Sequence, residues 1–261
     1  MLVRTWNLFH GNSVPPQRRA FLDEMVRLAT ADDPDVLCVQ EVPAWALGRF
    51  TAGDVAARPL LGPLPIPAVA GRALTALDHG LLRSAFAGQG NAVRLSSRLR
   101  LLEHRVLVLN DGAFRREQAR RLGLDRIARL AWAKERRIAQ LLRVDAGGRT
   151  FALANLHATS IADKRIPDAE LRRAADAATA LALDGEPVVL AGDLNVRGDA
   201  SPVLAELTGP GGFSPALPGI DHVLVRGART TDPARWPDER RAIDGRLLSD
   251  HSPVEVEVEL G

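Results

Sequence analysis

Short apolar runs that end in polar residues recur along the chain. Such runs are typical of strands buried in a sheet, and they occur at residues 3–8, 36–40, 91–95, 101–109, 139–144, 151–156, 188–191 and 220–225. In residues 253–260, Val and Leu alternate with Glu, which predicts a strand with one buried and one solvated face. The chain is therefore expected to be rich in β-structure, with polar groups gathered where strands end.

Three longer segments have the periodicity of helices. Residues 21–29 carry an apolar stripe, and the prolines at positions 15 and 16 are expected to open this helix, since proline is tolerated in a first turn. Residues 114–130 and 167–183 show the same pattern. Residues 45–86, with four prolines, predict a long irregular connection flanked by short helices. Because no linker-like stretch interrupts the pattern, we expect one domain over residues 1–261.

The composition is that of an ordinary globular protein, with 46% apolar and 25% charged residues. No apolar run approaches the roughly 20 residues that cross a bilayer, and the chain starts directly with an expected core strand, so neither membrane insertion nor secretion is expected. Cys38 is the only cysteine, which excludes an intrachain disulfide and a thiolate zinc cluster. We expect a cytoplasmic protein, and no obligate protein partner is evident.

Positive charge is concentrated in the middle of the chain, although the net charge is only +2. Between residues 94 and 143 there are 14 lysines and arginines but only 5 acidic residues. Such an excess can attract a polyanion, and nucleic acid is the partner that it favours. An arginine-rich solvated face is the alternative interpretation.

Polar residues mark the ends of the expected strands. They are Asn7, Glu41, Asn155, His157, Asp193, Asn195, Asp221, Asp250 and His251. If these ends converge, several carboxylates share a small volume and repel one another unless a cation neutralises them. Oxygen ligands without cysteine favour Mg²⁺ or Mn²⁺. Amide and imidazole donors beside such an ion suit a phosphate ester as substrate.

These residues stand in a series of short motifs. The motifs are Thr5-Trp6-Asn7, Gln40-Glu41, Gly90-Asn91-Ala92, Asn155-Leu156-His157, Gly192-Asp193-Leu194-Asn195, Ile220-Asp221-His222 and Ser249-Asp250-His251-Ser252-Pro253. In order and spacing the series resembles the endonuclease/exonuclease/phosphatase superfamily, the DNase I-like fold, over residues 3–260. The resemblance implies a four-layer α/β/β/α sandwich, in which two mixed β-sheets pack face to face with helices outside.

The resemblance also implies a metal site and a water-activating group. Glu41, with Asn7 and Asp250 close by, would hold the divalent metal, Mg²⁺ or Mn²⁺. Asp193, positioned with help from Asn195, would orient or deprotonate the nucleophilic water. The glycine before Asp193 is expected to leave room for substrate.

The resemblance to the superfamily also implies roles for two histidines. His251, held by Asp221, would contact the scissile phosphate, and His157 would donate to a phosphate oxygen or protonate the leaving group. An acid partner for His157 would have to be Asp54 or Asp78, the acids available between residues 42 and 90. The residues expected to bind substrate are Asn91, Asn155 and Arg137.

The function expected from these observations is a metal-dependent phosphodiesterase that cleaves DNA or RNA by in-line attack of water. A phosphoesterase acting on a small or lipid head-group phosphate, such as a phosphoinositide, sphingomyelin or a nucleotide, is the alternative. A non-catalytic binding scaffold is disfavoured, because a scaffold has no physical need for buried like charges.

Overall fold

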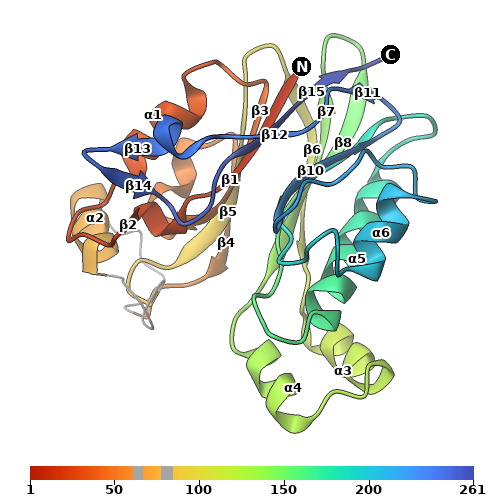
Figure 1. Ribbon diagram of the computed structural model, residues 1–261, viewed down its shortest axis with the longest axis horizontal. Coiled ribbons are helices and arrows are strands. Elements are labelled where there is room, and N and C mark those ends of the chain that lie inside the picture. The colour runs from red at the N-terminus through yellow and green to blue at the C-terminus, as the bar shows by residue number, and fades with distance from the viewer. Residues whose placement is uncertain (61–66, 78–84) are drawn as a thin grey trace.

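Two mixed β-sheets stand face to face in the computed structural model, which describes residues 1–60, 67–77 and 85–261 (Figure 1). The first sheet has the order β11 (Arg229–Thr230), β15 (Val254–Glu259), β1 (Leu2–Asn7), β3 (Val36–Pro43), β5 (Gln89–Leu95) and β4 (Ala52–Ala57), and β12 (Ala234–Arg235) also pairs with β15. The second has the order β10 (Asp221–Arg226), β9 (Val188–Asp193), β8 (Thr150–His157), β7 (Ile138–Asp145) and β6 (Arg100–Val108). Only β1 with β3 and β8 with β9 are parallel pairs among the described strands.

The facing sides of the sheets form a common apolar core. Val3 and Val93 of the first sheet belong to the same buried cluster as Phe151, Leu153 and Val189 of the second. In β15 the valines are buried and the glutamates between them are more exposed, as the alternation predicted. Burial of these β-branched and aromatic side chains is what holds the sheets together.

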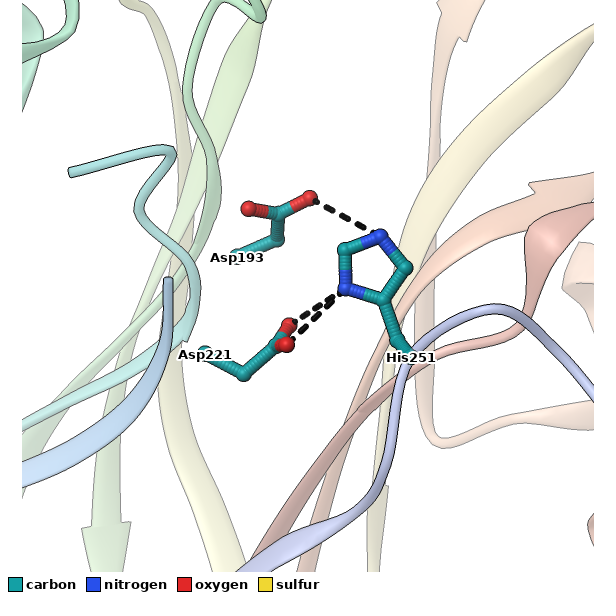
Figure 2. A group of neighbouring side chains, drawn as sticks. All are labelled: Asp193, Asp221 and His251. Carbon is teal, nitrogen blue, oxygen red and sulfur yellow. Dashed lines mark hydrogen bonds and ion pairs between the residues drawn. The ribbon is translucent and has the colours of Figure 1, made fainter. Parts of the chain in front are cut away.

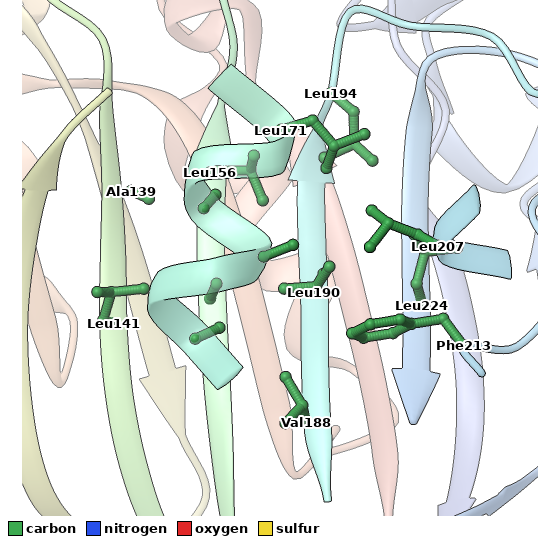
Figure 3. Close-up of a cluster of buried hydrophobic side chains, with 14 of the residues drawn as sticks. Ala139, Leu141, Leu156, Leu171, Val188, Leu190, Leu194, Leu207, Phe213 and Leu224 are labelled. Carbon is green, nitrogen blue, oxygen red and sulfur yellow. The ribbon is translucent and has the colours of Figure 1, made fainter. Parts of the chain in front are cut away.

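Helices cover the outer faces, which confirms the predicted four-layer fold. Helix α5 (Arg165–Leu181) and α6 (Pro202–Thr208) pack on the second sheet, where Leu171 and Leu207 meet Leu190 and Leu224 (Figure 3). Helix α1 (Leu22–Thr30) and the 3-10 segment η2 (Ala44–Arg49) cover the first sheet. The remaining elements on that side are α2 (Ala68–Leu77), η1 (Phe9–Gly11), η4 (Asp238–Arg241) and a small sheet of β13 (Ala242–Ile243), β14 (Arg246–Leu248) and β2 (Ser13–Val14).

Two helices replace the single helix expected over residues 114–130. Helix α3 (Gly112–Arg121) and α4 (Arg126–Ala133) form a helical hairpin that extends beyond the sheets (Figure 1). Gly123, at φ +61°, makes the turn between them, and the Asp125 carboxylate caps α4 by accepting from the Ala128 amide at 2.7 Å. The apolar pattern continues across this break because both helices contribute side chains to one buried cluster around Trp132 of α4.

Three further expectations are corrected. Helix α1 begins at Leu22, because residues 13 and 14 pair with β14 and the prolines at 15 and 16 lie in the loop that follows. The strand expected at residues 36–40 continues to Pro43, because a β-bulge between Val39 and Val42 lets β3 keep its pairing. Strand β4 lies within the stretch expected to be irregular, whereas η2 and α2 are short helices of the kind expected there. Within the described residues no helix is both long and apolar enough to span a bilayer.

A partly buried carboxylate ties the turn after α5 to the second sheet. Glu186 accepts from Arg143 Nη2 at 2.6 Å and from the Leu183 amide at 2.9 Å, and the Thr150 hydroxyl also donates to it. The Arg143 guanidinium, opposed by burial, lowers the pKa of Glu186 from 4.5 to about 2. The ionised form is therefore favoured in the folded state.

We predict that Glu186→Gln destabilises the protein by about 1–2 kcal/mol at pH 7. A depressed native pKa gives stability that is present above pH 4.5 and is lost as pH falls toward 2, so the difference between wild type and variant should shrink over that range. Urea unfolding at several pH values measures it. Glu259→Gln, whose side chain is 71% exposed, is the control and should change little. A difference that does not depend on pH would contradict the assignment.

Candidate active site

Polar strand ends from both sheets meet at one end of the sandwich. In the second sheet, strand register places Asp193 between His157 on β8 and Asp221 on β10. In the first sheet Asn7 pairs with Gln40, the neighbour of Glu41. The convergence expected from the sequence is therefore present.

A polar cavity of about 430 Å³ opens at this point. Its wall includes seven of the predicted site residues, namely Glu41, Arg137, His157, Asp193, Asn195, Asp250 and His251. Asn7 and Asp221 do not line the cavity, but they form hydrogen bonds with residues that do. The side chains that line the cavity are thus mostly charged groups and hydrogen-bonding groups.

Asn7 links the two halves of the site. Its Nδ2 donates to Glu41 Oε1 at 3.3 Å and to Asp193 Oδ2 at 3.0 Å, while its Oδ1 accepts from the Phe9 amide at 3.0 Å. The carboxamide is fully buried. Because Glu41 belongs to the first sheet and Asp193 to the second, one side chain fixes the spacing between acids from opposite sheets.

The surroundings of Asp193 disfavour the ionised form of its carboxyl group. It is 2% exposed. Burial, and then the nearby charge of Asp221, raises its pKa from 3.8 to about 7, although His251 acts in the opposite direction. Asn195 positions it through the main chain, since the Asn195 amide donates to Asp193 Oδ1 at 3.1 Å while its side chain donates to the Ala158 carbonyl at 2.9 Å.

Position 192 requires glycine for a reason different from the one expected. It has φ +145°, and a Cβ there would lie 1.9 Å from the Leu156 carbonyl oxygen of β8. The missing side chain therefore leaves room for the neighbouring strand, and the expectation that it leaves room for substrate is wrong. Any larger residue would push Asp193 out of its register with His157.

Asp221 and His251 form a paired acid and imidazole (Figure 2). Both Asp221 carboxylate oxygens lie 2.9 Å from His251 Nδ1, and His251 Nε2 lies 3.9 Å from Asp193 Oδ2. Burial opposes the imidazolium, but the hydrogen bond and charge of Asp221 outweigh it and raise the pKa of His251 to about 10. Trp6 Nε1 donates to the His251 carbonyl at 2.9 Å and so fixes the loop. His251 is a cation at neutral pH.

His157 has the opposite electrostatic surroundings. Its Nε2 lies 3.5 Å from Asp193 Oδ2, and Arg137 Nη1 lies 2.8 Å from the same nitrogen. Burial, and then the Arg137 charge, lowers the pKa of His157 well below its usual value. Of the two acids considered as its partner, Asp54 instead pairs with His104 at 2.7 Å, and Asp78 lies outside the described residues.

His10 is a site residue that the sequence analysis missed. It lies in η1, three positions after Asn7, with φ +58°, and its Nε2 is 3.3 Å from Glu41 Oε2. Glu41 itself sits in the bulge of β3 with φ +51°. The signal that could have found His10 is its place in the loop after a strand that already ends in a site residue.

The donors present fit a hard divalent cation. Glu41 is 14% exposed, and its buried Oε2, although 3.3 Å from His10 Nε2, accepts no hydrogen bond from the described residues, so it retains a lone pair for a ligand. Asp193, Asp221 and His251 also place one potential ligand atom each within 4.8 Å of the others. Because Asp221 and His251 already hydrogen-bond each other, the oxygen of Glu41 is the more available ligand.

Asn91 and Asn155 do not line the cavity, in contrast to their expected role in binding substrate. Asn91 Nδ2 donates to the Ile138 carbonyl at 3.1 Å. Asn155 is fully buried between the sheets, where its Nδ2 donates to the Ala92 carbonyl at 3.0 Å and to Gln140 Oε1 at 2.8 Å, and its Oδ1 accepts from Gln40 Nε2 at 2.8 Å. Both amides join one sheet to the other.

The family model named Endonuclease/Exonuclease/phosphatase family matches residues 5–251. The chain belongs to this family. Family members hydrolyse phosphoester bonds, and the cavity described above contains the groups for that chemistry. No curated protein sequence matches the chain.

Several solved structures share the fold at low identity. A functionally unknown conserved protein from Enterococcus faecalis V583 is 17% identical over 100% of both chains, with a TM-score of 0.64. TDP2 of D. rerio, humanized by 14 mutations, is 16% identical over 99% of this chain and 98% of its own, with a TM-score of 0.62. The mannosyl-6-phosphatase Bt3783 of Bacteroides thetaiotaomicron is 17% identical over 100% of both chains, with a TM-score of 0.60. These likenesses show the fold alone.

We predict that Asp221→Asn lowers the pKa of His251 from about 10 to below about 7, because burial then acts without the carboxylate that opposes it. An NMR titration of the His251 ring protons measures the change. Asp250→Asn is the matched control, since Asp250 Oδ1 is 3.8 Å from Nε2 and should matter less. Equal shifts in both variants would contradict a specific pair.

We predict that Asp193→Ala changes the pH dependence of stability in metal-free protein. A carboxyl with a native pKa of about 7 holds its proton when folded and releases it near pH 3.8 when unfolded, so wild type should lose up to about 4 kcal/mol relative to the variant between pH 4 and pH 8. Urea unfolding in EDTA measures this. Asp184→Ala, in an exposed turn, is the control and should run parallel to wild type.

Proposed function

We propose that this phosphoester hydrolase is a divalent-metal-dependent phosphodiesterase that cleaves nucleic acid by in-line attack of water. The observation that carries the proposal is the position of a buried carboxylate, Asp193, whose Oδ2 lies 3.5 Å from His157 Nε2 and 3.9 Å from His251 Nε2 in a single polar cavity. The excess of basic residues between positions 94 and 143, of which Lys134 and Arg137 line the cavity, favours a polyanionic substrate.

Asp193 is the group that orients the water and accepts its proton. Its pKa of about 7 suits a base that works near neutral pH. The His251 cation, 3.9 Å away and held by Asp221, faces the same space and stabilises charge that builds up on the phosphate. Arg137, 7% exposed, supplies a second fixed positive charge.

His157 acts on the leaving-group side. Because burial and Arg137 keep the ring neutral, one of its nitrogens carries a proton to donate to a phosphate oxygen. Glu41 and Asp250 would hold Mg²⁺ or Mn²⁺, and Asn7, whose Oδ1 accepts from the Phe9 amide, would position Glu41 through its Nδ2. When bound, the metal neutralises the phosphate and polarises it toward attack.

Hydrolysis of a small phosphate ester is the second candidate. One structural neighbour is named as a mannosyl-6-phosphatase, so this fold supports small sugar phosphates as substrates. A cavity of about 430 Å³ can accept such a molecule. Lipid head groups belong to the same alternative.

A substrate panel tests the proposal. Purified protein with Mg²⁺ or Mn²⁺ is expected to cleave single- or double-stranded DNA or RNA, and Asp193→Ala should reduce the rate by about 10²–10⁴-fold through loss of the general base. Glu41→Gln should raise the metal concentration needed for half-maximal rate, and Glu259→Gln should match wild type. Rapid hydrolysis of sugar phosphates with none of nucleic acid would favour the second candidate.

A further inference from the structure

A second cavity, lined by arginines, lies between α3 and α4. It has a volume of about 580 Å³. Arg115, Arg116, Arg120 and Arg129 line it, and Trp132 contributes to its apolar floor. We call it the arginine cavity. Its volume is within the range of roughly 300–1,000 Å³ typical of ligand sites.

The four guanidinium groups of the arginine cavity have no acidic partners among the residues that the structure describes. Arg120 Nε donates only to the Arg116 carbonyl at 3.4 Å, and Arg129 Nε to the Leu124 carbonyl at 2.8 Å. Arg115 Nε is buried and has no hydrogen-bond partner. Four unpaired cations around one concavity repel one another, so an anionic ligand stabilises the arrangement.

Other arginines nearby are paired, which shows that the difference is local. Arg173 lies 2.6 Å from Asp111, and Arg165 lies 2.6 Å from Asp163. The helical hairpin itself, residues 112–133, has six arginines but only two acidic residues. One of those acids is Asp125, whose carboxylate caps α4. The positive charge of the hairpin is therefore not balanced by acidic residues within it and is available to an external anion.

The arginine cavity is coupled to the catalytic cavity through the chain that follows α4. Ala133 lines the first cavity, and Lys134 and Arg137 line the second. Asn110 fixes this connection, because its Nδ2 donates to the Trp132 carbonyl at 3.3 Å and its Oδ1 accepts from the Arg137 amide at 2.9 Å. Consecutive residues of one fixed segment, Ala133 and Lys134, therefore line the two cavities.

We propose that the arginine cavity binds the phosphodiester backbone of a single nucleic-acid strand whose scissile phosphate lies in the catalytic cavity. This inference rests on the proposed function and adds a second contact region for its substrate. Arg116 and Arg120 are one helical turn apart, about 6 Å along the same face, so they can contact successive backbone positions. A positively charged groove that follows the backbone is typical of proteins that bind single strands.

An anionic membrane is the other partner that such a surface could meet. Ile127 and Leu130 on α4 are 78% and 62% exposed, and apolar side chains next to arginines can bind a lipid surface. Neither residue lines the arginine cavity, however, and a flat bilayer does not enter a concavity. The observations therefore favour the strand.

The test compares two double variants that lose the same charge from the same hairpin. Arg116→Ala with Arg120→Ala removes two lining residues, whereas Arg121→Ala with Arg126→Ala removes two that do not line this cavity. The probe is a labelled twelve-nucleotide oligothymidine in EDTA, followed by fluorescence anisotropy. We expect the first variant to bind about 10-fold or more weakly and its salt slope to fall by about 1.4, because each lost phosphate contact removes about 0.7. The second variant should change less than about 3-fold.

Several results would overturn the inference. Equal weakening in both double variants would indicate general charge attraction, and no weakening in the first would remove the arginine cavity from binding. Loss of binding to phosphatidylserine vesicles in Ile127→Ser with Leu130→Ser, with oligonucleotide binding unchanged by Arg116→Ala and Arg120→Ala, would assign the surface to membranes.

Activity measurements separate this inference from the proposed function. The Arg116→Ala, Arg120→Ala variant should hydrolyse bis(4-nitrophenyl) phosphate at the wild-type rate and show a raised KM only for the oligonucleotide. If wild type cleaves DNA and the variant has an unchanged KM, the inference is wrong and the function stands. If wild type binds the oligonucleotide through these arginines and cleaves none, the function is wrong and the cavity stands.

Discussion

The site depends on holding like charges together, and Asn7 is the residue that makes this possible. Glu41 and Asp193 come from different sheets, and the Asn7 carboxamide donates to both. A neutral donor relieves part of the repulsion without removing the negative charge that attracts a cation. Moving either sheet by one residue would break this bridge, so the packing of the sandwich and the chemistry of the site are parts of the same constraint.

The two histidines show how environment, and not residue type, divides the roles. His251 has a carboxylate on Nδ1 and is charged, whereas His157 has a guanidinium against it and is neutral. Asp193 lies between them. The same residue type therefore presents opposite charge states on the two sides of one carboxylate.

The strands and their polar ends could be predicted because they follow from local patterns of apolar and polar residues. The four-layer fold could be predicted from the series of short motifs. The features that escaped prediction depend on contacts between distant segments. Asn155 has the sequence context of a substrate ligand, yet its amide is saturated by the opposite sheet. The reason for Gly192 is a carbonyl on the neighbouring strand. His10 reaches Glu41 only because η1 turns back, which no periodicity encodes.

Asn155 has a mechanical consequence as well. A layer made only of valine and leucine would let two sheets slide, since apolar contact has no direction. Gln40, Asn155, Gln140 and Asp54 form a line of directional bonds across that layer, ending at His104 on β6. This line of bonds fixes the position of one sheet relative to the other. The halves of the active site keep their alignment under thermal motion because shear of the sheets would require several buried hydrogen bonds to break at once.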